Sequence, residues 1–201
     1  MLFIKHRCNT ISQLRDISKD YGLEIDLRSY KKDLILNHEP FENGILFRDW
    51  LEFYNHKFLI MNVKEEGLEE SCISLLREFK IKNYFFLDQS FPMLIKAAKQ
   101  NSLKTSIRFS QFESLETVLK FKGMVDWVWV DYYEKYPLSK NIIEILRRNN
   151  FKICLVSPEL QCYDLKEINL AFDSVKAYFS KIDAICTKHI SVWESLSFSE
   201  F

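Results

Sequence analysis

The sequence predicts an α/β fold, a compact (βα)8 barrel (TIM barrel) formed by a single domain over residues 1–201. Three observations predict it. Short apolar runs alternate with segments whose apolar residues have helical spacing, and eight such units follow one another. The runs are almost continuously apolar, as in parallel strands that are buried on both faces. A chain of 201 residues is near the lower limit for this barrel, which implies short loops.

The first unit is a short apolar strand followed by a helix. Leu2–His6 is the expected strand. Asn9 or Thr10 is suited to cap a helix, because Ile11 to Tyr21 contains apolar residues at helical spacing, and Gly22 is a suitable stop. The unit therefore ends just before the second apolar run.

The second unit contains a turn back. Leu23–Arg28 is the second expected strand, Ser29–Asp33 is a polar turn, and Leu34–His38 returns as a short extended segment. Ile45–Tyr54 is a short amphipathic piece that precedes the third strand, Lys57–Lys64.

The rest of the chain repeats the strand and helix pattern. The remaining expected strands are Tyr84–Asp88, Thr105–Phe109, Val125–Asp131, Phe151–Ser157 and Asp183–Thr187. The expected helices are Leu68–Phe79, Phe91–Gln100, Leu115–Phe121, Ile142–Arg148 and Leu165–Phe179, with a short closing helix in Ser191–Phe201.

The composition restricts the class of protein. The 28 basic and 28 acidic residues balance, so no global field attracts nucleic acid or an anionic membrane. No apolar run approaches the length of a membrane span, so we expect no stable membrane insertion. The odd number of cysteines, five, lacks metal-ligand spacing and indicates reduced thiols. With no recognisable leader at the N-terminus, the expected location is the cytoplasm.

The second strand carries the main candidate site. Residues two apart on a strand share a face, so Glu24 and Asp26 point the same way. Two carboxylates on one face are able to chelate a hard cation. An ion pair with Arg7, Arg28 or Lys64 is the alternative. His6 and His38 end the neighbouring segments, where a histidine is suited to move a proton to or from a phosphate oxygen.

These residues occur in an order that resembles the glycerophosphodiester phosphodiesterases, which are relatives of the phosphatidylinositol-specific phospholipases C. The order is His6-Arg7, Asn9-Thr10, a helix, Glu24-x-Asp26-x-Arg28, a Lys-Lys-Asp turn and an apolar run into His38. The resemblance implies a (βα)8 barrel with a divalent metal at its mouth, Mg2+ or Ca2+, and a hydrolase that cleaves phosphodiesters in lipid metabolism.

The resemblance also assigns roles to single residues. It makes Glu24 and Asp26 metal ligands, and it makes His6 and His38 the general acid and base. Arg7 would contact the phosphate oxygens, and a salt bridge to Glu24 is its alternative role. Lys64 would neutralise the phosphate.

The chain departs from the family at the third strand, where Asn62-Val63-Lys64 stands in place of Glu-x-Lys. Asn62 would be a neutral third ligand, which weakens binding of a hard cation. Asn9 could supply a carbonyl ligand, and Asp88 or Asp131 could restore negative charge. The sequence does not choose among these. Arg108 is a further candidate because it lies at the end of a strand.

Two functions from different classes are the main candidates, and an unrelated (βα)8 lyase or isomerase is a third possibility. The first is metal-dependent hydrolysis of a small soluble phosphodiester resembling a glycerophosphodiester. The second, suggested by Asn62 and the short loops, is a catalytically weakened barrel that binds a phosphate-containing ligand without turnover. The sequence leaves the oligomeric state and the leaving group undetermined.

Overall fold

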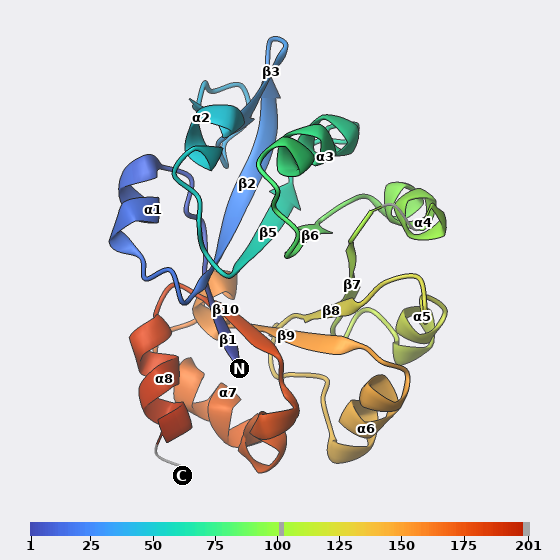
Figure 1. Ribbon diagram of the computed structural model, residues 1–201. Coiled ribbons are helices and arrows are strands. Elements are labelled where there is room, and N and C mark those ends of the chain that lie inside the picture. The colour runs from blue at the N-terminus through green and yellow to red at the C-terminus, as the bar shows by residue number, and fades with distance from the viewer. Residues whose placement is uncertain (101–102, 199–201) are drawn as a thin grey trace. The chain divides into compact units, whose positions relative to one another are not determined.

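The computed structural model describes residues 1–100 and 103–198, which form two compact units. The N-terminal unit is His6–Lys104, and the C-terminal unit combines Met1–Lys5 with Thr105–Phe201. Each unit has strands and helices in alternation, so the fold is α/β as predicted (Figure 1). No helix within the described residues has the length and apolar character needed to cross a membrane.

The N-terminal unit contains a mixed sheet with the strand order β4-β3-β2-β5-β6. Strands β2, β5 and β6 are parallel, whereas β3 and β4 return antiparallel beside β2. The strands are β2 (Gly22–Tyr30), β3 (Asp33–Leu36), β4 (Ile45–Leu46), β5 (Phe58–Val63) and β6 (Tyr84–Leu87).

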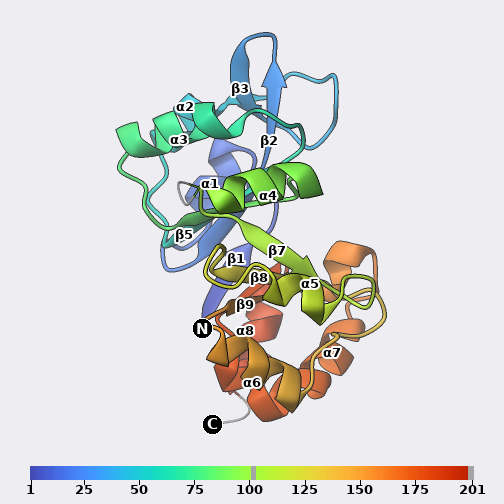
Figure 2. The same cartoon turned by 90° about the vertical axis from the view of Figure 1, so that its right-hand side faces the viewer.

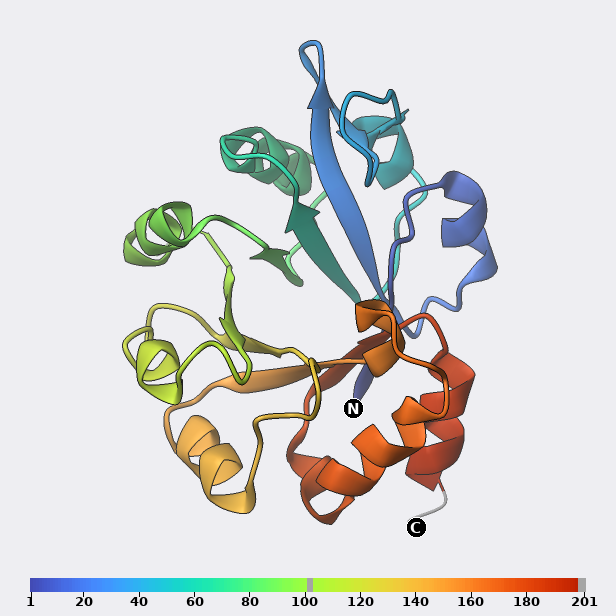
Figure 3. The ribbon, with the colours of Figure 1, turned by 180° about the vertical axis from the view of Figure 1, so that it is seen from behind.

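Four helices pack in this unit. They are α1 (Ile11–Asp16), α2 (Phe47–Leu51), α3 (Glu69–Glu78) and α4 (Phe91–Lys99). Seen from behind, β2 and β5 run side by side, with α3 on one side and α1 and α2 on the other (Figure 3). Helix α1 begins with the predicted cap at Thr10, which forms a capping box with Gln13. It ends earlier than expected because Ile17 is extended, in a stretch of Ile, Ser and Asp residues that favour helices weakly.

The core of the N-terminal unit fixes which way β2 faces. Leu23, Ile25 and Leu27 are fully buried and join a hydrophobic cluster with residues of all four helices. Alternation along the strand therefore places Glu24, Asp26 and Arg28 on the opposite face. On the paired strand β5, Leu59, Met61 and Val63 join the same cluster, which leaves Asn62 beside Asp26 on the polar face.

The C-terminal unit contains a parallel sheet with the strand order β1-β10-β9-β8-β7. Its strands are β1 (Leu2–Lys5), β7 (Ser106–Phe109), β8 (Trp127–Val130), β9 (Lys152–Val156) and β10 (Ala184–Thr187). Its helices are α5 (Leu115–Leu119), α6 (Lys140–Arg148), η1 (Pro158–Gln161), α7 (Glu167–Val175), η2 (Lys176–Lys181) and α8 (Ile190–Phe198). Helices α6, α7 and α8 lie outside the strands of this unit (Figure 2).

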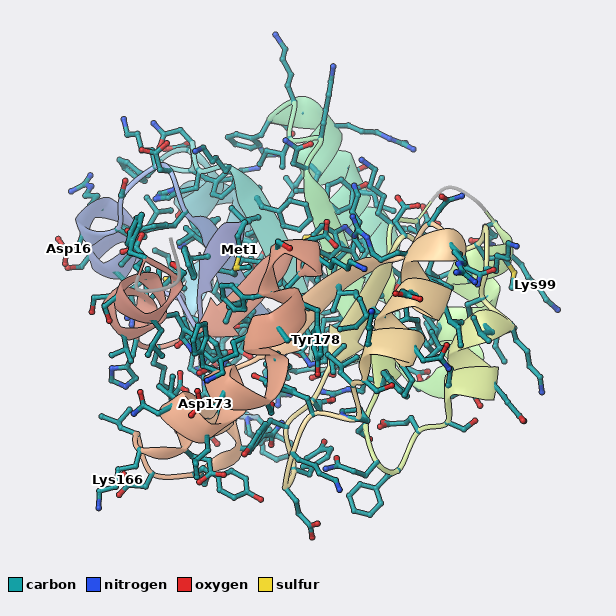
Figure 4. The ribbon with its side chains drawn as sticks, turned by 90° about the horizontal axis from the view of Figure 1, so that it is seen from below. Met1, Asp16, Lys99, Lys166, Asp173 and Tyr178 are labelled. Atoms are coloured by element: carbon teal, nitrogen blue, oxygen red, sulfur yellow. The ribbon has the colours of Figure 1, made fainter. Side chains whose placement is uncertain are left out.

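The helix expected over Leu165–Phe179 is divided in the structure. Helix α7 ends at Val175, and the chain continues as the 3-10 segment η2, in which Tyr178 leaves helical geometry. The Tyr178 hydroxyl donates to the Ser174 carbonyl at 2.7 Å, which ties the two parts together at this break. Figure 4 labels Asp173 and Tyr178 on the two parts.

Buried polar side chains in the C-terminal unit bind one another. Asp131 is fully buried and accepts hydrogen bonds from Arg108, from Trp129 Nε1 at 3.2 Å and from Gln161 Nε2 at 3.2 Å. Around a second buried carboxylate, Glu159, the Thr187 hydroxyl donates at 2.6 Å and the Lys188 backbone donates at 2.9 Å. These groups are satisfied within the unit and stabilise the ends of its strands.

The eight predicted strands are confirmed, each within a residue or two of its expected ends. They are the strands that pair in parallel in the two units. The extended segment expected over Leu34–His38 is confirmed in its first part as the antiparallel strand β3, and β4 is an additional antiparallel strand. Of the expected closed barrel, the α/β class and the eight strands are confirmed. Strand pairing is established only within each unit, so closure of the barrel is not confirmed. The closing helix is confirmed as Ile190–Phe198, and its expected last residues, 199–201, lie outside the described residues.

Phe86→Ala tests the core of the N-terminal unit. Phe86 is completely buried in the hydrophobic cluster, so truncation leaves a cavity and lowers the free energy of unfolding by about 3–5 kcal/mol. Phe41→Ala is the matched control, because Phe41 is fully exposed. Urea unfolding measures both, and equal effects of the two variants would contradict the packing described.

Asp131→Ala tests whether the Asp131 network is structural. The substitution leaves the partners of a buried carboxylate unpaired and lowers the free energy of unfolding by about 3–5 kcal/mol. The control is Asp173→Ala, which removes an exposed ion pair with Lys176 and costs less than about 1 kcal/mol. A loss for Asp131→Ala as small as that of the control would refute the structural role.

Candidate active site

The candidate site lies on the polar face of β2 in the N-terminal unit. Glu24 and Asp26 are both 1% exposed and follow one another on this face. Their burial is unusual for carboxylates, which rarely leave water unless they are paired. The surrounding residues therefore decide how the two charges are compensated.

The turn after β1 binds Glu24. The Arg7 backbone donates to Glu24 Oε2 at 2.7 Å, and His6 Nε2 lies 3.6 Å from the same oxygen. Arg7 has a positive φ of 57°, a left-handed conformation that is uncommon outside glycine. The Cys8 backbone donates to the Glu24 carbonyl at 2.8 Å, which ties the turn to β2. The side chain of His6 is therefore positioned against a buried carboxylate.

Asn9 holds Asp26 at two points. Its side-chain amide donates to Asp26 Oδ2 at 2.8 Å, and its carbonyl oxygen accepts from the Asp26 backbone at 2.9 Å. Because its carbonyl is already engaged, Asn9 acts here as a positioning residue for Asp26. The residue directly after it, Thr10, caps α1, so one short segment orients the carboxylate and starts the helix.

Two cations flank Asp26. Arg7 Nε lies 3.4 Å from Asp26 Oδ2, and Lys64 Nζ lies 3.3 Å from Asp26 Oδ1. Lys64 also approaches Asp88 Oδ2 at 3.9 Å. Asp88 follows β6 with a positive φ of 63°, so a second left-handed residue stands at this site. Both cations that the sequence assigned to substrate binding are thus paired with carboxylates.

Three buried oxygens at the site accept no hydrogen bond within the described part of the chain: Glu24 Oε1, Asp26 Oδ1 and Asn62 Oδ1. Lys64 is an ionic neighbour of Asp26 Oδ1, but its geometry does not make a hydrogen bond. Asn62 pairs with Asp26 across β2 and β5 and lies near Glu24. The three oxygens come from adjacent positions of two paired strands.

The pKa of Glu24 is raised to about 8. Burial is the largest cause, because it penalises the charged form, and the negative charge of Asp26 adds to it. The Arg7 backbone, Asn62 and Lys64 oppose the rise. Near neutral pH the pair therefore favours a proton or another cation between its oxygens.

His38 lies in the loop between β3 and β4. Asn37 shapes this loop through bonds to the Asn43 carbonyl at 3.0 Å and from the Glu39 backbone at 3.1 Å. Gly44 closes it, because a Cβ there would lie 2.3 Å from the Leu36 carbonyl oxygen. The imidazole of His38 pairs with Glu39 through Nδ1 at 2.6 Å.

Glu39 connects this loop electrostatically to the site. The pKa of Glu39 is lowered, first by His38 and more weakly by the charges of Arg7 and Arg28. Arg28 Nε also donates to the His38 carbonyl at 3.0 Å. His38 is therefore held beside the site by its neighbours, although its side chain contacts neither Glu24 nor Asp26 among the described residues.

The structure brings together most of the predicted site. Hydrogen bonds, ion pairs and electrostatic contacts join the following predicted residues in one cluster: His6, Arg7, Asn9, Glu24, Asp26, Asn62, Lys64 and Asp88. Arg108 and Asp131 belong to the C-terminal unit and pair with each other. Arg28, expected only as an ion-pair partner, lies on the polar face as the Glu-x-Asp-x-Arg alternation indicates. Glu39, which follows His38 and was not among the predicted site residues, is the partner of the His38 imidazole.

Chemically, the cluster offers buried carboxylate and amide oxygens, a histidine in contact with one carboxylate, and cations at its edge. No group of three or more His, Cys, Asp or Glu arranged for a metal ion occurs in residues 1–100 and 103–198. The third oxygen here belongs to an amide, Asn62. Hard cations are bound by oxygen ligands, and both carboxylate and amide oxygens can serve.

Comparisons of sequence find no counterpart. No protein-family model matches the chain, and no curated protein matches it.

Comparisons of structure do find similar folds. A protein from Agrobacterium tumefaciens, provisionally identified as a glycerophosphoryl diester phosphodiesterase, has a TM-score of 0.66 at 10% identity, covering 100% of this chain and 98% of that one. A glycerophosphoryl diester phosphodiesterase from Parabacteroides distasonis has a TM-score of 0.65 at 11% identity, with coverages of 98% and 86%. A mutant tryptophan synthase α-subunit from Pyrococcus furiosus has a TM-score of 0.56 at 11% identity, with coverages of 92% and 86%. The chain is therefore similar in fold to glycerophosphoryl diester phosphodiesterases over nearly its whole length.

Proposed function

We propose that this chain is a phosphodiester hydrolase that acts on a small soluble substrate resembling a glycerophosphodiester. The observation that carries the proposal is the contact of His6 and Arg7 with the buried pair Glu24 and Asp26. The similar folds named as glycerophosphoryl diester phosphodiesterases support it. Within the proposal the chain is one closed (βα)8 barrel domain over 1–201, and the protein works in the cytoplasm.

His6 is the first proposed proton-transfer group. Its Nε2 lies 3.6 Å from Glu24 Oε2, so Glu24 orients the imidazole ring. The ring is only 13% exposed, which limits competition from water. A histidine held in this way is suited to accept a proton from the attacking hydroxyl or water, or to donate one to the leaving alkoxide.

His38 is the second proposed proton-transfer group. Its Nδ1 is paired with Glu39, which leaves Nε2 available for the opposite proton step. The loop that carries it is braced by Asn37 and by the close approach at Gly44. Two histidines with separate carboxylate partners are suited to play acid and base in one turnover.

The oxygen atoms of the site fit a hard divalent cation, Mg2+ or Ca2+. Glu24 Oε1, Asp26 Oδ1 and Asn62 Oδ1 are buried without hydrogen bonds in the described chain, and such oxygens are costly unless something compensates them. Glu24, Asp26 and Asn62 would hold the ion. When bound, it supplies Lewis-acid stabilisation of the phosphoryl oxygens.

Arg7 and Lys64 are the proposed phosphate-binding residues. Each lies within 3.4 Å of Asp26, so their charges are fixed in place before a substrate arrives. A phosphate above Asp26 would share both cations, and the negative charge that develops during cleavage would be spread over them. Asn9 keeps Asp26 in the orientation that both require.

A second candidate function is binding of a phosphate-containing ligand without turnover. Asn62 favours it, because a neutral amide stands beside Asp26 where the resemblance expects a carboxylate. Lys64 favours it as well, since its ammonium group already neutralises Asp26. Both features weaken the attraction for a divalent cation.

Turnover of glycerophosphoethanolamine with Mg2+ or Ca2+ tests the proposed hydrolase. We expect metal-dependent release of ethanolamine by the wild type, and a loss of kcat of about 100-fold or more in His6→Ala, because a positioned acid or base contributes that much. Lys19→Ala is the control, as Lys19 is exposed and is not one of the site residues. Circular dichroism verifies that each variant is folded.

The variant Asn62→Glu separates the two candidate functions. If the wild type shows no turnover and Asn62→Glu gains metal-dependent turnover, the chain is a weakened barrel and the hydrolase proposal is wrong. If His6→Ala retains full activity, His6 has no role in the chemistry.

The raised pKa of Glu24 predicts a pH-dependent stability difference. Below about pH 4.5 Glu24 keeps its proton in both the folded and the unfolded state, so its raised pKa does not change the free energy of unfolding. Between about pH 4.5 and pH 8 the unfolded state loses this proton and the folded state keeps it, so the free energy of unfolding falls as the pH rises. In EDTA, Glu24→Gln should therefore match the wild type near pH 4 and exceed its free energy of unfolding by about 3–5 kcal/mol at pH 8. Urea unfolding at both pH values measures it, with Glu70→Gln as the exposed control. A difference that does not change with pH would contradict the burial of Glu24.

A further inference from the structure

Arg28 extends the row of charged residues on the polar face of β2. It follows Glu24 and Asp26 at the same two-residue spacing. With a rise of about 3.3 Å per residue, its Cα lies roughly 7 Å beyond that of Asp26 along the strand. The pairing of Asp26 with Asn62 places Arg28 level with Lys64, the residue that follows the end of β5, while β2 continues to Tyr30.

Arg28 differs from the other cations of the site in its partners. Arg7 and Lys64 are both paired with Asp26. Arg28 has no salt bridge within the described residues, and its Nε donates to the His38 carbonyl at 3.0 Å. This bond fixes the plane of the guanidinium group and leaves the donors on Nη1 and Nη2 for a further acceptor. Arg28 is therefore a half-buried positive charge that is oriented but not neutralised.

The charges of Arg28 and Arg7 both act on the carboxyl group of Glu39. Both lower the pKa of Glu39, whose side chain is 60% exposed, so the fields of both arginines extend to a carboxylate at the solvent side of the site. Glu39 itself is bound to His38. An anionic group of a ligand would therefore bind Arg28 without displacing a salt bridge of that arginine.

We propose that Arg28 binds a second anionic group of the substrate, separate from the phosphate that is cleaved. The inference rests on the proposed function, because it takes the scissile phosphate to lie over Asp26 between Arg7 and Lys64. The preferred substrates are then phosphodiesters whose alcohol portion carries an oxyanion such as a carboxylate. A guanidinium group suits this task, since its planar fork matches the two oxygens of a carboxylate.

Two pairs of compounds that differ only in one carboxylate test the proposal. O-phosphoserine and O-phosphoethanolamine form the binding pair, measured by calorimetry in the presence of Mg2+. Glycerophosphoserine and glycerophosphoethanolamine form the matching diester pair for turnover. We expect the wild type to bind O-phosphoserine about 10-fold more tightly than O-phosphoethanolamine, because one additional charge-assisted hydrogen bond lowers the Kd by about that factor.

Three variants identify the source of this preference. Arg28→Gln should abolish the 10-fold ratio while it leaves the Kd of O-phosphoethanolamine nearly unchanged. Arg28→Lys should retain part of the ratio, since it keeps the charge but loses the fork. Lys32→Gln, which removes an exposed charge at the tip of the β2–β3 turn, should leave the ratio intact. A merely structural role of Arg28 through His38 would weaken both ligands equally and would not change the ratio.

The outcomes separate this inference from the proposed hydrolase. A carboxylate preference that depends on Arg28, with neither diester cleaved, supports the anion site and refutes turnover. Cleavage of both diesters with equal KM, together with equal binding of the two monoesters, refutes the anion site and leaves the hydrolase standing. Absence of binding by both monoesters also overturns the inference, as does a preference that persists in Arg28→Gln.

Discussion

Two carboxylates buried side by side on β2 are the constraint on which the rest of the site depends. Glu24 and Asp26 are buried because the same strand must place Leu23, Ile25 and Leu27 in the hydrophobic core. Their charges would be costly without compensation. Residues of the turn after β1 and the residue after β5 compensate these charges with hydrogen bonds and ion pairs.

This compensation is uneven, and the unevenness indicates function. Each carboxylate receives a hydrogen bond and keeps one oxygen without one among the described residues, but Asp26 has two cationic neighbours, whereas the pKa of Glu24 is raised. By contrast, the buried Asp131 of the C-terminal unit is surrounded by donors. A carboxylate that serves only stability is expected to resemble Asp131. Glu24 resembles a group that is kept for a ligand or a proton.

The sequence predicted the strands and the polar face of β2 because both follow from a period of two in the hydrophobic pattern. Glu24 and Asp26 were identified for this reason. Features that depend on local backbone geometry and on the choice of side-chain partner were not predictable. The early end of α1, the break at Tyr178 and the pairing of His38 with its neighbour Glu39 arise from backbone geometry and side-chain rotamers that periodicity does not encode. The mutual pairing of Arg108 and Asp131 depends on the pairing of β7 with β8.

Anomalous diffraction from crystals grown with Mn2+ most directly tests the central proposal, that the oxygens of Glu24, Asp26 and Asn62 would hold a divalent cation. The account predicts one anomalous peak within bonding distance of Glu24 and Asp26, which disappears in crystals of Glu24→Gln. A map at saturating Mn2+ with no peak at these residues would contradict it.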